Sequence, residues 1–448
     1  PLPAKCSCGF QLIWVRLVYP DKWALRTRQR AIPENVSNHN DKRMRRILFF
    51  ILIIFNTYAC LGQKKLNNEI SSYVHFLQKN SYSAKEYIMT LWDKYDIVIF
   101  CERFHGEVTQ YNLLLDIIKD ERFISNIGNI YTEIGSITIQ QDLNIFLQTN
   151  YSNEELRKDQ LLNIYRNLTF SPYWEKYNFY HFLSSINMLN NTVQESLKLK
   201  IHPLSFEFPG WENFKTSTEY KNWFYEQPNF DSIMAVNFIK QYEIQLKNDV
   251  RKKALVILNY RHAFSKDVKN EMQGNSIYIP NTARYIFEKY PQKVANVLLN
   301  TWTSLPVNNP DIGDPHVPIQ GGKWDASFKY IGIKSMGFDF ENSPFGYDTF
   351  DLWPFSTTEL KYKDFFTGFV FYLPLTEHYE LYGIPGLVSN DFREELRRRL
   401  EIFNPVWNWD TQGQKSEINK TLKQLNRLQK ERYYKLNRKL KLIDKWLN

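Results

Sequence analysis

Short, fully apolar runs alternate along the chain with longer segments in which apolar residues recur every three or four positions. The run DIVIFC at 96–101 is rich in β-branched residues, which favours a buried strand. The segment EVTQYNLLLDIIKD at 107–120 has the spacing of an amphipathic helix. Further apolar runs predict strands at 129–136, 199–207, 253–264, 293–302 and 366–375. Helical spacing predicts helices at 66–95, over most of 137–196, and at 229–249.

This alternation predicts an α/β fold with a mainly parallel sheet flanked by helices. Several helical patterns follow one another in 137–196, which we expect to be a helical insertion. The Pro-, Gly- and Asp-rich stretch 309–325 and the acidic, aromatic stretch 337–354 are expected to be loops. We therefore place one α/β domain at 66–410. The basic segment 411–448 is expected to be an amphipathic C-terminal helix that packs on the domain, with binding to a membrane surface as the alternative.

Residues 44–62, MRRILFFILIIFNTYACLG, begin with two arginines and end with small residues, and a short apolar run lies between. This three-part pattern is typical of a bacterial signal peptide, and the run is short for a membrane span. A buried core helix fits less well, because two arginines directly precede the run. We predict an exported protein, either secreted or periplasmic after cleavage at Gly62, or a lipoprotein anchored to the membrane at Cys60. Residues 1–43 would then be a non-native upstream extension.

The formal charge of +9 does not indicate a nucleic-acid-binding protein, because the positive charge lies at the two ends. Residues 1–43 hold eight basic and three acidic residues, and residues 411–448 hold eleven basic and three acidic ones. The body between them is net negative, so we expect a small-molecule or peptide substrate and no nucleic acid. Of the four cysteines, Cys101 alone lies in the body, which leaves no disulfide framework and no cysteine-based zinc site.

Titratable residues follow four of the predicted strands. Glu102 and His105 close the first strand, Glu133 closes the second, Glu207 the third and His262 the fourth. Ligands of open α/β sheets bind at the carboxyl ends of parallel strands, so these side chains are expected to converge at one edge of the sheet. Each residue alone is more often a structural or solvated side chain, and the repeated placement carries the prediction.

A histidine with a neighbouring glutamate suits general base catalysis near neutral pH, because the carboxylate fixes the tautomer and stabilises the charged ring. The same set, Glu102, His105, Glu133 and His262, would also suit a divalent metal such as zinc, manganese or cobalt. The sequence contains no Gly-x-Ser-x-Gly elbow, no phosphate-binding Walker loop and no His-Glu-x-x-His motif. An ordinary serine hydrolase, a nucleotide hydrolase of that type and a zincin protease are thus disfavoured.

The motifs resemble the erythromycin esterase-like family, which is related to the Tiki metalloproteases and to the ChaN-like haem-binding lipoproteins. The family's first motif reads Gly-Glu-x-x-His-Gly, and this chain has CERFHGE, with Cys101 in place of the first glycine. The likeness continues over about 96–265. The supporting stretches are TEIG at 132–135, SPYWEKYNFYHFLSSINMLNN at 171–191, FDSIMAVNFI at 230–239 and LNYRHAFSK at 258–266.

The resemblance implies that His105 is the general base that activates water. It implies that Glu102 and Glu133 are its carboxylate partners or metal ligands, and that His262 completes the pocket. The family's second motif often reads His-Asn-x-His, whereas this chain has Asn259-Tyr260-Arg261-His262. The residues expected to bind substrate are Arg261, Glu207 and Asp231.

The leading interpretation is an exported hydrolase that acts on an ester, a lactone or an amide, with or without a divalent metal. One alternative is a ChaN-like surface lipoprotein that binds haem or iron. The other is a catalytically silent relative that binds partners.

Overall fold

The computed structural model describes residues 66–448, with gaps at 173, 175, 271–276, 305–315, 353, 356, 358, 408–414 and 433–435. The chain divides into two compact units, Pro1–Lys64 and Lys65–Asn448, and the second holds all the described elements. The expected upstream extension 1–43, the signal segment 44–62 and its lipid-anchor residue Cys60 lie outside the described residues. A search of the described part finds no helix with the length and apolar character needed to cross a membrane.

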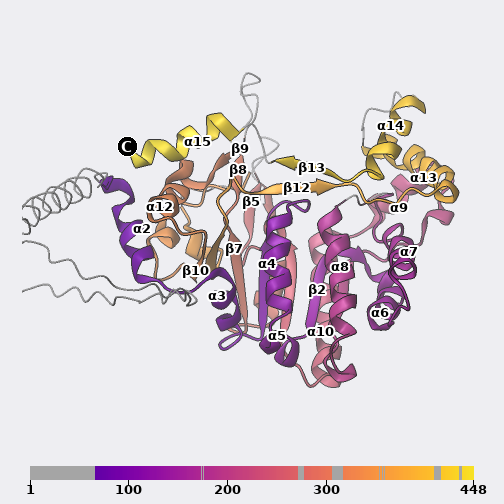
Figure 1. The fold of residues 1–448 in the computed structure, drawn as a ribbon, viewed down its shortest axis with the longest axis horizontal. Helices are drawn as coiled ribbons and strands as arrows, with labels where there is room; N and C mark the ends of the chain where they lie inside the picture. The colour runs from indigo at the N-terminus through magenta and orange to yellow at the C-terminus, as the bar shows by residue number, and fades with distance from the viewer. Residues whose placement is uncertain are drawn as a thin grey trace, which may run out of the picture. The chain divides into compact units, whose positions relative to one another are not determined.

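The main sheet has seven strands in the order β10-β11-β7-β1-β4-β2-β3 (Figure 1). Every neighbouring pair runs parallel except β10 and β11, which pair antiparallel at one edge. The prediction of an α/β fold with a mainly parallel sheet is thereby confirmed. The strands are β1 (Ile97–Glu102), β2 (Asn129–Ser136), β3 (Lys200–Ser205), β4 (Ala254–Asn259), β7 (Val294–Leu299), β10 (Ser335–Asp339) and β11 (Gly368–Tyr372).

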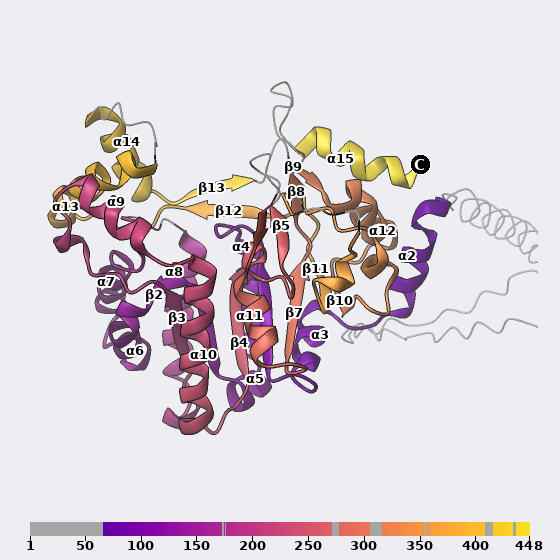
Figure 2. The same cartoon turned by 180° about the vertical axis from the view of Figure 1, so that it is seen from behind.

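Helices cover both faces of the sheet, as Figures 1 and 2 show from opposite sides. One face packs against α3 (Ala84–Leu91), α4 (Val108–Ile118), α5 (Glu121–Asn126), α6 (Gln140–Gln148), α7 (Glu154–Tyr165) and α8 (Tyr177–Asn190). The other face packs against α2 (Asn68–Lys79), α10 (Phe230–Asn248), α11 (Thr282–Lys289) and α12 (Lys323–Ile331).

Successive side chains of β1 point to opposite faces of the sheet, which explains why the strand is apolar from Ile97 to Cys101. Val98 and Phe100 join the buried cluster on one face, whereas Ile97 and Ile99 join the cluster on the other. Successive strand residues point to opposite faces, so a strand covered on both sides needs an apolar residue at every position. Glu102 ends this run, and it is the first residue of the strand that brings a charge to the carboxyl edge.

Several elements differ from the sequence-based expectations in extent. The single helix expected at 66–95 is two helices, α2 and α3, and the Ser83 side chain caps the start of α3. The stretch 337–354 was expected to be a loop, but its beginning belongs to strand β10. The expected loop 309–325 contains β9 (His316–Pro318) and the start of α12.

The C-terminal part adds elements beyond the sheet. Strand β12 (Tyr379–Tyr382) pairs antiparallel with β13 (Gln429–Arg432), and the helices α13 (Asn390–Phe403) and α14 (Lys415–Leu425) lie between them in sequence. The final helix is α15 (Leu436–Asp444). In its described residues the basic tail therefore contains α14, β13 and α15 rather than one helix. Strand β13 joins the ribbon with β12, and α15 lies against α12, where Asp444 pairs with Lys329 (Figures 1 and 2).

Candidate active site

Three adjacent strands, β1, β4 and β2, deliver the candidate site residues to the carboxyl edge of the sheet. Glu102 ends β1, and its register partner Asn259 ends β4. Glu133 lies in β2 on the other side of β4. The turns that follow β1 and β4 supply His105 and His262. Of the side chains expected to converge from separate strand ends, Glu102, His105, Glu133 and His262 lie together.

His105 is held by a carboxylate from its own turn. Its Nδ1 lies 2.6 Å from Glu102 Oε2. A carboxylate can only accept a hydrogen bond, so the proton must be on Nδ1. The Glu102 side chain is 1% exposed, whereas that of His105 is 29% exposed. A buried carboxylate thus fixes the tautomer of a ring that remains open to solvent.

His262 is held in the same way, but by a carboxylate from a distant helix. Its Nδ1 lies 2.8 Å from Oδ1 of Asp231, in the first turn of α10. Asp231 also accepts hydrogen bonds from the backbone N–H and the hydroxyl of Thr282, the first residue of α11. The His262 side chain is 23% exposed. Asp231, which the sequence placed among substrate-binding residues, is therefore the partner of a histidine.

Glu133 faces both imidazoles. Its Oε1 lies 3.5 Å from Nε2 of His105 and 3.6 Å from Nε2 of His262. Its Oε2 accepts a 2.7 Å hydrogen bond from the backbone N–H of Asn259. One carboxylate thus sits between two rings whose Nδ1 atoms are each committed to another carboxylate.

The surrounding carboxylates raise the pKa of both histidines. Burial alone would lower the pKa of His105, but the negative charges of Glu102 and Glu133 outweigh it, and the net shift from the usual 6.5 is upward. At His262 burial is again the largest effect and acts downward, while Glu133 and Asp231 raise the pKa to about 9. At neutral pH, His262 is therefore an imidazolium, and the pKa of His105 lies above its usual value.

The other two charged residues of the turn, Arg103 and Glu107, form a buried ion pair. Arg103 contacts Glu107 at 2.8 Å, and it also donates to the carbonyl oxygens of Asn300 and Tyr372. Glu107 accepts from the backbone N–H groups of Thr109 and Gln110 and so caps α4. Arg103 and Glu107 fix the shape of the turn, whereas Glu102 and His105 belong to the cluster with Glu133.

Residues of α8, of the segment before it and of strand β12 contact this turn. Asn178 of α8 donates to the carbonyl oxygen of His105 at 2.6 Å, and the Trp174 ring packs edge-on to the imidazole at 5.3 Å. Strand β12 lies against Gly106, where an added Cβ would come within 3.3 Å of the Glu380 carboxyl group. A larger residue at this position would therefore require the Glu380 carboxyl group to shift.

Two of the predicted substrate-binding residues are less closely tied to the site. Arg261 directly precedes His262 and is exposed, and its guanidinium lies over the Tyr260 ring at 5.7 Å. Glu207 lies two residues beyond β3 and is exposed. Among the described residues, the ion-pair partners of the two histidines are Glu102, Glu133 and Asp231, so Glu207 is not one of them.

Two residues that contact the candidate site were not predicted from the sequence. Asn259 positions Glu133 through its backbone N–H, and its side chain donates to the carbonyl oxygen of Arg103. Trp174 packs on the His105 ring. Both lie in stretches that resemble the family, but nothing in their local spacing indicates a contact with a histidine.

The geometry does not fit the metal centre that the sequence offered as an alternative. Within the described residues, no group of three or more His, Cys, Asp or Glu side chains is arranged to hold a metal ion. Both Nδ1 atoms are already hydrogen-bonded to carboxylates, and both Nε2 atoms point at a single oxygen of Glu133. We therefore derive no reaction step through a metal.

Comparison with known proteins gives matches among solved structures. No protein-family model matches the sequence, and no curated protein matches it. An erythromycin esterase, EreC, in its open conformation is similar at 8% identity and a TM-score of 0.41, over 68% of this chain and 96% of that one. A succinoglycan biosynthesis protein is similar at 10% identity and a TM-score of 0.43, over 69% and 97%. Haem-binding ChaN of Campylobacter jejuni is similar at 15% identity and a TM-score of 0.25, over 54% and 92%.

The structural neighbours thus include the erythromycin esterase and ChaN groups that the sequence motifs resemble. At TM-scores below 0.5, these similarities do not assign an activity to this chain. Its function must be inferred from the geometry of the site.

Proposed function

We propose that this protein is a hydrolase of the erythromycin esterase-like type that activates water at His105 to cleave an ester, a lactone or an amide. One observation carries the proposal. Two solvent-accessible imidazoles, each oriented by its own buried carboxylate, face the shared carboxylate of Glu133. Two imidazoles placed in this way suit a general base and a general acid in one site.

In the proposed reaction His105 is the base. Its neutral Nε2 takes a proton from water while the water oxygen attacks the acyl carbon of the substrate. The ring becomes an imidazolium, and Glu102 stabilises that charge through the hydrogen bond at Nδ1. Trp174 packs on the ring and Asn178 holds the backbone of the turn, so the base keeps its orientation during the transfer.

His262 is the acid. At neutral pH it carries a proton on each ring nitrogen, because Asp231 and Glu133 raise its pKa to about 9. Its Nε2–H can stabilise the oxyanion that forms when water adds to the carbonyl group. As the tetrahedral intermediate collapses, the bond from the acyl carbon to the leaving oxygen or nitrogen breaks. The leaving group takes up a proton from His262, while His105 keeps the proton that it took from water, so the site still carries one imidazolium. Loss of the proton from His105 to solvent and uptake of a proton by His262 restore the starting state.

The export of the protein is part of the same proposal. It is supported by the pattern of 44–62 in the sequence, which lies outside the described residues. Amino-terminal sequencing of the mature protein tests it, with a first residue between Cys60 and Lys64 expected. A mature chain that retains residues 1–43 would contradict it, and a lipid on Cys60 would identify a membrane-anchored lipoprotein.

Activity is tested with a panel of esters, lactones and short peptides, assayed with the wild type and with His105→Ala. The matched control is His75→Ala, which removes an exposed histidine from α2. Turnover by the wild type and the control, but not by His105→Ala, supports the proposal. Wild-type inactivity on every substrate, with and without added zinc, manganese or cobalt, would favour a binding protein. A porphyrin absorption band in the purified protein would favour the haem-binding alternative.

A further inference from the structure

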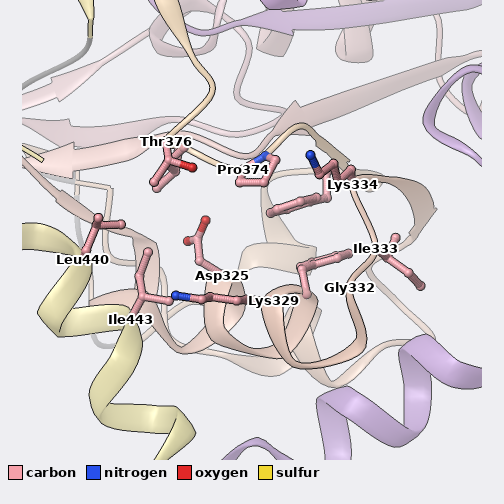
Figure 3. Close-up of a pocket in the computed structure, with 12 residues that line it drawn as sticks. Asp325, Lys329, Gly332, Ile333, Lys334, Pro374, Thr376, Leu440 and Ile443 are labelled. Atoms are coloured by element: carbon pink, nitrogen blue, oxygen red, sulfur yellow. The ribbon is translucent and has the colours of Figure 1, made fainter.

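A pocket lies between α12, the segment after β11, and α15 (Figure 3). Its volume is about 220 Å3. Apolar side chains form most of its wall, and Asp325 of α12 projects its carboxyl group into the space (Figure 3). The apolar residues are Phe328, Ile333, Phe371, Pro374, Leu375, Leu440 and Ile443. None of the residues that line this pocket belongs to the candidate active site.

Asp325 is the unusual member of this lining. Its side chain is buried, with 7% of the residue exposed, and no hydrogen bond satisfies its Oδ1 in the described part of the chain. Leaving a buried polar oxygen without a partner costs free energy, so native structures rarely tolerate it without a reason. A carboxyl group at the end of an apolar pocket is a ready acceptor for a donor on a ligand.

The other charged side chains of the pocket are already neutralised. Lys329 pairs with Asp444 at 2.7 Å, and Lys334 pairs with Glu377 at 2.6 Å. Arg103 acts on Asp325 through its charge, while its hydrogen bonds include those to Glu107, to the side chains of Thr109 and Asn300 and to neighbouring backbone carbonyl groups. The carboxyl group of Asp325 is therefore the charge in this pocket that a ligand could balance.

The ionisation of Asp325 is poised to respond to such a ligand. Burial raises the pKa of its carboxyl group to about 7, and the backbone N–H of Asp325 and the charge of Arg103 offset only part of that rise. A bound cation would favour the ionised form, since an opposite charge nearby lowers the pKa of a carboxyl group. An anion would meet the reverse effect.

We propose that this pocket binds a small organic cation, a primary amine on an apolar or aromatic body, with the ammonium group donating to Asp325. The apolar wall would hold the body, and the buried carboxylate would select the charge. The size agrees, because an apolar cavity of about 150 Å3 already holds benzene. A pocket of about 220 Å3 has room for a phenyl ring and a short amine-bearing arm.

Calorimetric titration of the full-length protein with 2-phenylethylamine tests the proposal at pH 8, where Asp325 is ionised. The comparison compounds are 2-phenylethanol and phenylacetate, which keep the ring and replace the ammonium by a neutral or an anionic group. We expect the amine to bind at least about tenfold more tightly than the alcohol, the usual gain for a charge-assisted hydrogen bond. Phenylacetate should bind most weakly, and the preference for the amine should shrink at pH 6.

Two variants separate the roles of charge and shape. Asp325→Asn should bring the affinities for amine and alcohol within about threefold of each other, because the amide keeps the shape without the charge. Leu440→Trp should abolish binding of all three compounds by filling the space. The control Glu155→Gln changes an exposed residue of α7 and should leave the tenfold preference intact. Circular dichroism confirms that each variant is folded.

Three results would overturn the proposal. The first is no detectable amine binding to the folded wild type. The second is a preference for phenylacetate over the amine. The third is an unchanged preference for the amine in folded Asp325→Asn. If that variant does not fold, unaltered amine binding in Leu440→Trp leads to the same conclusion. None of these outcomes depends on hydrolytic activity, so failure of the pocket and failure of the active site are distinguishable.

Discussion

The two histidines of the candidate site are held in the same way but by different means. In both, Nδ1 donates to a buried carboxylate and Nε2 faces Glu133. The carboxylate of His105 comes from three residues away in the same turn, whereas that of His262 comes from α10, at Asp231. One pair is therefore set by local sequence and the other by tertiary packing.

The two histidines also differ in the charged groups that shift their pKa values. Glu102 and Glu133 raise the pKa of His105 above 6.5, whereas Glu133 and Asp231 raise that of His262 to about 9. Both rings are therefore more basic than a free imidazole, through carboxylates that come from different parts of the chain. The surroundings of a histidine decide whether it is better suited to act as an acid or as a base.

His105→Ala removes the proposed base. Turnover of an accepted substrate should fall by roughly 10²–10⁴, the usual contribution of a positioned base. The fold should persist, because the turn is fixed by Arg103 and Glu107 rather than by the imidazole. Steady-state kinetics and circular dichroism measure the two effects, with His75→Ala as control. Full activity in His105→Ala would remove the central role of this ring.

Glu133→Gln tests whether the two rings share one partner. The amide keeps the shape of the carboxylate and removes its charge, so both pKa values should fall. Activity should drop by roughly 10–100-fold, the effect expected when a group that orients a functional side chain is lost. Glu155→Gln is the matched control at an exposed position. NMR titration of the two rings would contradict the shared role if only one of them shifted.

The pKa of His262 also makes a prediction for stability. Because its folded-state pKa is raised from 6.5 to about 9, the stabilisation is fully present below about pH 6.5 and is lost as pH rises through 9. For a partly exposed ring this is on the order of 2 kcal/mol. Denaturant unfolding at pH 6.5 and pH 10 measures it, and His262→Gln should reduce the difference between the two. An equal difference in the variant would assign the pH dependence to other groups.

The pH profile of activity distinguishes the His105–Glu102 pair from the His262–Asp231 pair. With His105 acting as base and His262 as acid, kcat/KM should be bell-shaped, with an acid limb above 6.5 and an alkaline limb near 9. The limbs belong to the coupled pair, since both rings face Glu133. Asp231→Asn should move the alkaline limb down by about one unit or more, and Glu102→Gln should move the acid limb instead. Movement of the same limb in both variants would merge the two roles.

Arg261→Ala should have the smallest effect. The side chain is exposed and lies over the Tyr260 ring, so its loss should cost under about 1 kcal/mol of unfolding free energy. If Arg261 binds a substrate carboxylate, KM should rise for substrates that carry that charge and stay unchanged for neutral ones. A uniform loss of kcat on neutral substrates would instead place Arg261 at the reacting group.

The local part of this architecture is predictable from sequence. The strand β1 is apolar from Ile97 to Cys101 because both of its faces are covered, Glu102 ends it, and His105 lies in the turn that follows. The parallel-strand rule then brings Glu133 and His262 to the same edge. Their assignment to catalysis remains a prediction until activity is measured.

The long-range part is not predictable in the same way. Asp231 precedes His262 by 31 positions, and only packing of α10 and α11 beside β4 makes it a partner of that ring. The strand β13, with the sequence QKER, has no apolar residue at all, because it is held by backbone pairing with β12. Strand β10 was missed because its pattern is short and merges with a turn-rich stretch. Hydrophobic periodicity carries no information on such contacts.

The ribbon of β12 and β13 also has a consequence for the order in which the protein is completed. Strand β12 lies against Gly106 and Glu107, and its pairing partner β13 follows far later in the sequence. During synthesis, the turn that carries His105 emerges long before its cover can form. Pairing of the ribbon must wait until β13 has left the ribosome. The candidate site is thus assembled from the first strand of the sheet and from a segment that is translated long after it.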